Sequence, residues 1–135
     1  MSNQIVSMAG EYYVAAELSK RGFQVALTLK NAKAMDMMVY HDQLPHPLTV
    51  EVKTLQKRNC FSLKVRNIER KRMYVFVILN ALGVVPNFFI VTGHELLRDQ
   101  KHYFGSSLDR LDEWQTVNVG PLRIWDGKWE LFFQK

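Results

Sequence analysis

Residues 34–55 decide the fold. They read Ala34-Met35-Asp36-Met37-Met38-Val39-Tyr40, then a turn with Pro45 and Pro47, then Leu48-Thr49-Val50-Glu51-Val52-Lys53-Thr54-Leu55. Both arms are short, apolar and bounded by turn-forming residues, which predicts that each is a β-strand with a core-facing side. Each arm nevertheless carries charge in its middle, so the stretch bears on function as well as on fold.

The spacing of these charges predicts that they meet. Residues i and i+2 of a strand share a face, so Glu51 and Lys53 point the same way. If the arms pair antiparallel, any register in which paired residue numbers add to an odd total brings Asp36 to that face. Two buried carboxylates repel each other and need a counter-ion, and oxygen ligands favour Mg²⁺ or Mn²⁺. The alternative is a surface ion pair between Glu51 and Lys53; the apolar neighbours of Asp36 favour the buried site.

A helix is predicted from about Ser7, as a possible N-cap, to Arg21, with Gly22 as its stop. Its apolar stripe is expected to contain Met8, Val14, Ala15 and Leu18. Glu11 falls in the same stripe by helical spacing, whereas Glu17 does not. A carboxylate on a buried face is a local inconsistency of the kind found at functional sites, although a favourable interaction with the helix dipole is an alternative explanation.

The next residues complete an ordered series. Residues 23–29 alternate well enough for a strand, residues 31–33 turn the chain, and the strands that carry Asp36 and Glu51 follow. Helix, three strands, a basic segment and a further strand resemble the αβββαβ order of the PD-(D/E)XK nuclease superfamily, and Asp36 followed by Glu51-Val52-Lys53 resembles its core motif, with Met35 in place of the proline. Gly10-Glu11 resembles the opening of archaeal Holliday junction resolvases. The resemblance covers residues 7–92.

The resemblance implies an α/β fold with a mixed central sheet flanked by helices. It implies that Asp36 and Glu51 bind Mg²⁺ or Mn²⁺ together with the Val52 carbonyl, and that Glu11 completes the metal site directly or through water. Lys53 would orient or activate the attacking water and offset charge in the transition state. Hydrolysis of this kind leaves a 5′ phosphate and a 3′ hydroxyl.

Positive charge is concentrated directly after the Glu51 strand. The chain carries a net charge of +5, made up of −1 for residues 1–52, +7 for residues 53–72 and −1 for the remainder. Such a block beside a metal site predicts phosphate binding without sequence readout, although a solvated basic surface is the alternative. The candidate phosphate contacts are Lys57, Arg58, Lys64, Arg66, Arg70 and Arg72, and Gln56 could face the scissile group. Apolar and polar side chains alternate in residues 61–65, which are expected to form a strand or a short helix.

Residues 73–93 contain no charged side chain, which raises the question of a membrane span. Polar and turn-forming residues interrupt the run, so we predict two buried strands instead, residues 74–79 and 88–92. Thr92 is expected to begin a short helix that extends to about Gln100.

The last third of the chain is less regular. Residues 109–114 are compatible with one or two helical turns, and residues 116–119 with an edge strand. Asp126-Gly127 signals a tight hairpin, whereas Leu122, Trp125, Trp129 and Phe132 keep the spacing of a short docking helix, which we favour. The three tryptophans are expected in the core or a dimer interface rather than as stacking platforms for bases.

Other classes of chemistry lack support in the sequence. The lone Cys60 permits no internal disulfide and suits a reducing cytoplasm, where we expect the protein, and no signal peptide is recognised. The histidines lack zinc-site spacing, and no glycine-rich phosphate loop indicates an organic cofactor. With no linker in the chain, residues 1–135 are expected to form one domain.

These features predict a small endonuclease that hydrolyses DNA phosphodiester bonds and depends on Mg²⁺ or Mn²⁺. A branched or junction substrate is favoured over a specific sequence, and cleavage of two strands would favour a homodimer. Two alternatives stay open: a catalytically silent nucleic-acid-binding or assembly subunit of the same fold, and a domain whose basic patch binds an acidic protein.

Overall fold

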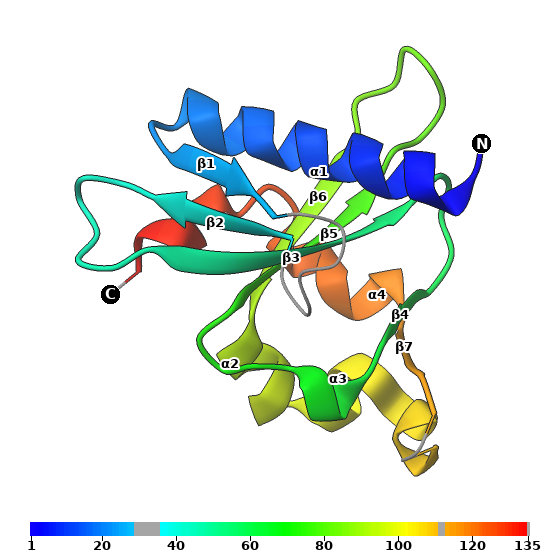
Figure 1. The fold of residues 1–135 in the computed structure, drawn as a ribbon. Coiled ribbons are helices and arrows are strands. Elements are labelled where there is room, and N and C mark those ends of the chain that lie inside the picture. Colours follow the sequence, from blue (N-terminus) through cyan, green and yellow to red (C-terminus); the bar gives the residue numbers. More distant parts are fainter. Residues whose placement is uncertain (29–35, 111–112, 135) are drawn as a thin grey trace.

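A computed structural model describes residues 1–28, 36–110 and 113–134. Five strands form one sheet in the order β1-β2-β3-β5-β6 (Figure 1). All neighbours are antiparallel except β3 and β5, which are parallel, so the sheet is mixed. The strands are β1 (Gln24–Leu27), β2 (Met37–Tyr40), β3 (Leu48–Leu55), β5 (Met73–Ile78) and β6 (Asn87–Thr92).

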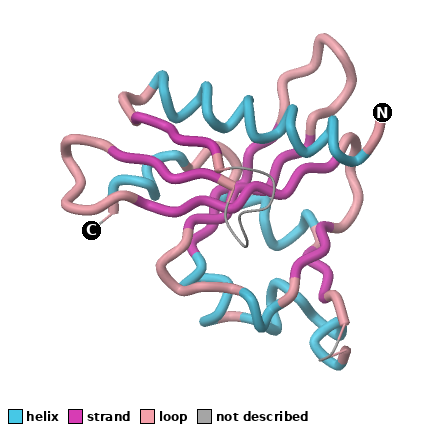
Figure 2. The backbone as a smooth tube through the Cα atoms, in the orientation of Figure 1, coloured by secondary structure: helices cyan, strands magenta, loops and turns pink. Residues whose placement is uncertain are grey.

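Helices cover the sheet on both sides, as expected. The long helix α1 (Asn3–Lys20) lies along one face, and the short helices α2 (Gly93–Arg98) and α3 (Gln100–Phe104) lie on the opposite side with a two-stranded sheet (Figure 2). That small sheet pairs β4 (Phe61–Leu63) with β7 (Gln115–Val117). The predicted mixed α/β architecture is therefore confirmed.

The two faces of the sheet bury separate cores. Alternate side chains of β3 and β5, such as Val50 and Val75, pack with Val14 and Leu18 of α1. The other side chains of β5, including Tyr74 and Phe76, pack with β4, β7 and the short helices. Every residue of β5 is buried, which is the pattern of a central strand covered on both sides.

The predicted pairing of the two decisive arms is confirmed. Met37 pairs with Val50 and Val39 with Leu48, so the register totals are odd. Register is strongly specified here because a slip by one residue would turn the buried Met37 and Val39 to the other face of the sheet. Residues 34 and 35, which the prediction included in the first arm, and the predicted turn at residues 31–33 lie outside the described residues.

Helix α1 differs from its prediction in start and in face. It begins four residues earlier, because the Ser2 side chain accepts a hydrogen bond from the Ile5 amide and caps it. Its buried face is Val6, Gly10, Val14 and Leu18, whereas Met8, expected in the core, is exposed. The predicted stop is confirmed, since Gly22 has a φ of 90°.

The segment between β3 and β5 settles an open alternative. Residues 61–63 are strand β4, and a single 3₁₀ turn, η1 (Val65–Asn67), follows. These two short elements stand where the expected order has its second helix. The apolar run 73–93 forms β5, β6 and their connection, as predicted. Among the described residues, no helix combines the length and the apolarity needed to cross a membrane.

The C-terminal part forms short helical elements: η2 (Gly105–Asp109), α4 (Val119–Leu122), η3 (Arg123–Trp125) and η4 (Trp129–Phe133). The favoured docking helix is therefore split, because Gly127 turns the chain at a φ of 69° and donates to the Phe88 carbonyl at the edge of β6. Leu122 packs on one face of the sheet, and Trp129 and Phe132 on the other. The expected turns at 109–114 fall partly outside the described residues.

Candidate active site

Asp36 lies at the point where β2 begins. Its amide donates to the Val50 carbonyl at 3.0 Å, and its Oδ2 accepts from the Val52 amide at 2.6 Å. β2 pairs with β3 only as far as Val50, so the Asp36 carboxylate lies at the unpaired edge of β3, next to Val52. Since the N–H and C=O of one strand residue point to the same side, the Val52 carbonyl faces this edge too.

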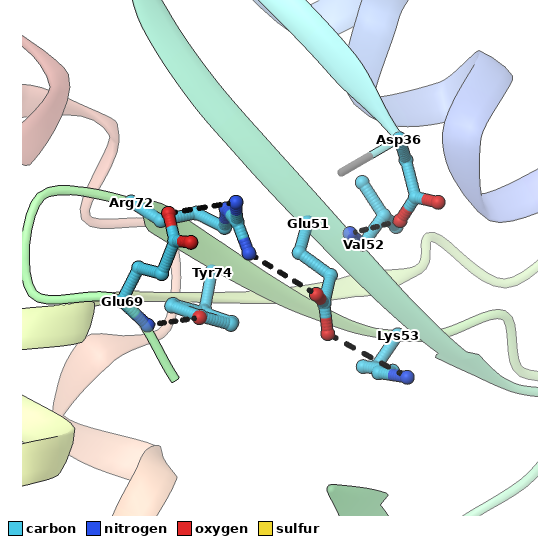
Figure 3. A network of polar contacts seen from close by, with 7 residues as sticks. All are labelled: Asp36, Glu51, Val52, Lys53, Glu69, Arg72 and Tyr74. Carbon is cyan, nitrogen blue, oxygen red and sulfur yellow. Dashed lines mark hydrogen bonds and ion pairs between the residues drawn. The ribbon is translucent and has the colours of Figure 1, made fainter. Parts of the chain in front are cut away.

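Glu51 and Lys53 project from β3 on the face away from α1, as their spacing predicts. Glu51 Oε2 lies 3.5 Å from Lys53 Nζ, and Glu51 Oε1 lies 3.9 Å from Arg72 Nη1 (Figure 3). Arg72 also binds Glu69 Oε2 at 2.8 Å. The Glu51 side chain is thus held between a half-exposed ammonium and a buried guanidinium.

Glu11 reaches the same region from α1, which packs on the opposite face of the sheet from Glu51 and Lys53. The helix can approach β3 because Gly10 has no side chain, and an added Cβ would lie 1.8 Å from Thr54 Oγ1. A glycine at this contact lets the two backbones pack closely. The next residue, Glu11, is thereby carried to the edge of β3 that Asp36 occupies.

These side chains line one pocket of about 760 Å³. Its walls are the first half of α1, the edge of β3, residues 60–62 at the start of β4, and Trp114. Glu11, Asp36, Glu51, Val52 and Lys53 all line it. The structure thus brings Glu11, Asp36, Glu51 and Lys53 to one pocket, and their assignment as site residues stays a prediction.

Burial raises the pKa of all three carboxyl groups. For Glu11, desolvation is the larger cause, and the charge of Asp36 adds to it. Desolvation also raises the pKa of Asp36, against the Val52 amide and the charges of Lys53 and Arg72. The pKa of Glu51 is raised by desolvation despite the opposing charge of Lys53. Burial therefore disfavours the ionised forms, and the charges of Lys53 and Arg72 offset this only in part, so a bound cation would stabilise the carboxylates.

The donor set fits a hard divalent ion in its chemistry, since it consists of carboxylate and carbonyl oxygens. In the described parts of the chain, no group of three or more His, Cys, Asp or Glu residues is close enough to hold a metal ion. Glu51 in particular is engaged by Lys53 and Arg72. The ligand set of Glu11, Asp36, Glu51 and the Val52 carbonyl thus stays a prediction.

The predicted phosphate contacts fall into three groups. Lys57 and Arg58 are exposed in the loop that leaves β3, and Lys64 is half-buried beside the pocket. Arg66 and Arg70 are exposed farther along, and Arg70 contacts the His94 ring at 2.8 Å. Arg72 differs from the prediction, because it is 5% exposed and serves as a counter-ion inside the protein. Gln56 is exposed and is not one of the residues that line the pocket.

Trp114 was not predicted at the site. The expectation of buried tryptophans holds for Trp129, which is 6% exposed, and partly for Trp125, whose Nε1 donates to the Tyr103 hydroxyl at 2.8 Å. Trp114, in contrast, is 51% exposed and lines the pocket. The charged neighbour Glu113, which is exposed, was the signal in the sequence against a core position.

Comparison with solved structures reveals the kind of fold that carries this pocket. A bacterial homing endonuclease, I-Ssp6803I, superposes with a TM-score of 0.64 at 13% sequence identity, over 98% of this chain and 92% of the endonuclease. The chain has the fold of this endonuclease. Hjc, a Holliday junction resolvase of Archaeoglobus fulgidus, superposes with a TM-score of 0.54 at 11% identity, over 87% of this chain and 88% of the resolvase. No family model and no curated protein matches the sequence.

Proposed function

We propose that this chain is an endonuclease that hydrolyses DNA phosphodiester bonds with the help of Mg²⁺ or Mn²⁺. The observation that carries the proposal is the single pocket shared by Glu11, Asp36, Glu51 and Lys53 at the open edge of β3. A nuclease fold and the basic loop that leaves the same strand support it. A protein that only binds phosphates gains nothing from partly compensated carboxylates beside them, which argues against a silent binding subunit.

The roles of the residues follow from their positions. Glu11, Asp36, Glu51 and the Val52 carbonyl would hold the ion, which when bound supplies Lewis acidity at the phosphate and activation of water. Lys53 would orient the attacking water and offset the negative charge that builds on the phosphorane-like transition state. The water oxygen bonds to phosphorus as the bond to the 3′ oxygen breaks, so the products are a 5′ phosphate and a 3′ hydroxyl.

A branched DNA is the substrate we favour. The chain has few elements outside the sheet, the two cores and the pocket to read base edges in a groove. The similarity to a Holliday junction resolvase supports this choice. A substrate with two strands to cut would be served by a homodimer.

Cleavage of supercoiled plasmid, a linear duplex, a flap and a four-way junction, each with Mg²⁺ or Mn²⁺, tests the proposal. We expect the junction or flap to be cut and Asp36→Asn to lose at least about a hundredfold in rate, as for removal of a charged group at the reacting centre. Asp42→Asn is the matched control, because Asp42 is exposed and does not line the pocket. The enzyme proposal fails if wild type and Asp36→Asn leave every DNA intact.

A further inference from the structure

Trp114 presents its indole ring to the pocket. The side chain is 51% exposed and lies just before β7, across the pocket from α1. The Lys53 Nζ lies 5.7 Å from the ring centroid and the Lys64 Nζ lies 4.8 Å from it. One of the two lysines near this ring is therefore also the partner of Glu51 at the candidate active site.

Unlike Trp114, the other two tryptophans direct their rings to partners inside the protein. Trp129 is buried between Phe88 and Phe132, and the Trp125 nitrogen has a hydrogen-bond acceptor in Tyr103. Leaving a large aromatic surface in water forfeits the free energy that its burial would contribute. An exposed indole beside charged groups in a pocket is instead typical of a ligand-binding surface.

A nucleotide combines the two chemistries that these side chains recognise. Its base offers an aromatic face to an indole, and its phosphate offers oxygens to the ammonium groups that lie near the ring. A base inside a duplex has both faces covered by its neighbours, so only an unstacked base could contact the ring. Because the Lys53 Nζ lies 5.7 Å from the Trp114 ring centroid and 3.5 Å from Glu51 Oε2, such a base would belong to a nucleotide beside the phosphate in the pocket.

We propose that Trp114 is a stacking platform for an unpaired nucleobase next to the scissile phosphate, and that it selects DNA with an unpaired nucleotide at the cleavage position. The inference rests on the proposed nuclease function for the position of the phosphate. It goes beyond that function by naming the feature of the DNA that the pocket recognises. Lys64 would bind a flanking phosphate and uncover the ring for the base, while Lys53 stays at the scissile phosphate.

The test measures binding in Ca²⁺, without cleavage. The probes are three oligonucleotides that differ at one position: an intact duplex, a flap with one unpaired nucleotide, and the same flap with an abasic nucleotide. We expect wild type to prefer the flap, and Trp114→Ala to lose about tenfold in affinity for the flap and less than twofold for the duplex and the abasic flap. Trp114→Phe should keep most of the preference, because it keeps an aromatic face.

Two controls make the outcome decisive. Tyr12→Ala removes an aromatic side chain that is 56% exposed and does not line the pocket, so it should change none of the affinities. Urea unfolding of each variant identifies loss of fold, and Trp114→Leu, which keeps apolar bulk but has no aromatic face, serves if Trp114→Ala does not fold. The inference is overturned if Trp114→Ala weakens all three probes equally or weakens none.

The nuclease proposal can fail separately. If the flap preference depends on Trp114 but no DNA is ever cut, the stacking proposal is supported and the nuclease proposal is contradicted. If DNA is cut by wild type and spared by Asp36→Asn while Trp114→Ala keeps the flap preference, catalysis survives and stacking does not.

Discussion

Arg72 and Glu51 form an internal charge pair in the wall of the pocket, with 3.9 Å between Arg72 Nη1 and Glu51 Oε1 (Figure 3). The pair crosses from the start of β5 to the middle of β3, two parallel neighbours. Arg72 Nε and Nη1 are buried and have no hydrogen-bond acceptor among the described residues. The geometry assigns Arg72 to holding Glu51 in place rather than to contacting DNA.

Replacement of Arg72 tests this assignment. In Arg72→Met the pKa of Glu51 should rise further, because the charge of Arg72 opposes the effect of burial. The acid limb of the cleavage rate should therefore move to higher pH, since more base is needed to ionise Glu51. Stability should fall by about 3 kcal/mol, because Glu51 loses its buried counter-ion and keeps only the more exposed Lys53. Urea unfolding and a pH–rate profile are the measurements.

Arg70→Met is the matched control for this change. Arg70 is exposed and lies two residues away, so its loss should weaken DNA binding and leave the acid limb and the unfolding midpoint nearly unchanged. Equal pH profiles for Arg72→Met and wild type would contradict the role given to Arg72.

Glu11 should make the protein less stable as pH rises. Its pKa is raised in the folded state, so between the unfolded pKa and the folded pKa the native protein binds more protons than the unfolded chain. The contribution of Glu11 to stability is then fully present below about pH 4 and is lost as pH rises through the folded pKa. Glu11→Gln should consequently unfold at a higher urea concentration than wild type at pH 7, and at the same concentration at low pH.

Glu17→Gln serves as the control for Glu11→Gln. Glu17 Oε1 binds Arg21 Nη1 at 2.9 Å outside the pocket, so its neutralisation removes an ion pair and should not stabilise the protein. A Glu11→Gln variant that is no more stable than wild type at pH 7 would show that burial does not destabilise the ionised Glu11 carboxylate.

The segments that could be predicted from the sequence are those whose hydrophobic periodicity fits only one arrangement of strands. The odd register between β2 and β3 follows from a side-chain period of two, with Met37, Val39 and Val50 all needing burial. In the apolar run that became β5 and β6, Asn80, Gly83 and Pro86 lie in the connection between the two strands. For these segments, local pattern and tertiary packing agree.

The unpredictable part depends on contacts between segments that are distant in sequence. Gly10 lies in the buried face of α1 because Thr54, on β3, leaves no room for a Cβ, and the helical wheel contains no information about that contact. Arg72 looks like its basic neighbours until Glu51 and Glu69 are placed beside it. Trp114 resembles Trp129 in type, and only the position of the pocket separates their environments.

Gly10→Ala should destabilise the protein despite the better helix propensity of alanine. The added Cβ would overlap Thr54 Oγ1 and force α1 away from β3, at a net cost of about 2 kcal/mol once the gain in propensity is subtracted. Glu11 would move with the helix, so the cleavage rate should fall as well. Gly120→Ala is the matched control, because a Cβ there meets nothing within 4 Å in α4. Thr54→Ala should restore part of the stability of Gly10→Ala, and the absence of any rescue would contradict the proposed contact.

The exposed loop after β3 should supply salt-dependent affinity. Lys57 and Arg58 follow the strand that carries Glu51, and both are exposed where that strand leaves the pocket. Each phosphate contact releases condensed counterions, so replacement of both by alanine should lower the slope of log affinity against log salt by about two, with equal losses for different DNA sequences. Lys101→Ala/Lys128→Ala removes the same charge from exposed positions that do not line the pocket and should leave the slope unchanged. Titration in Ca²⁺ over a series of salt concentrations measures both. Equal slopes for the two double variants would mean that net charge, rather than this loop, attracts the DNA.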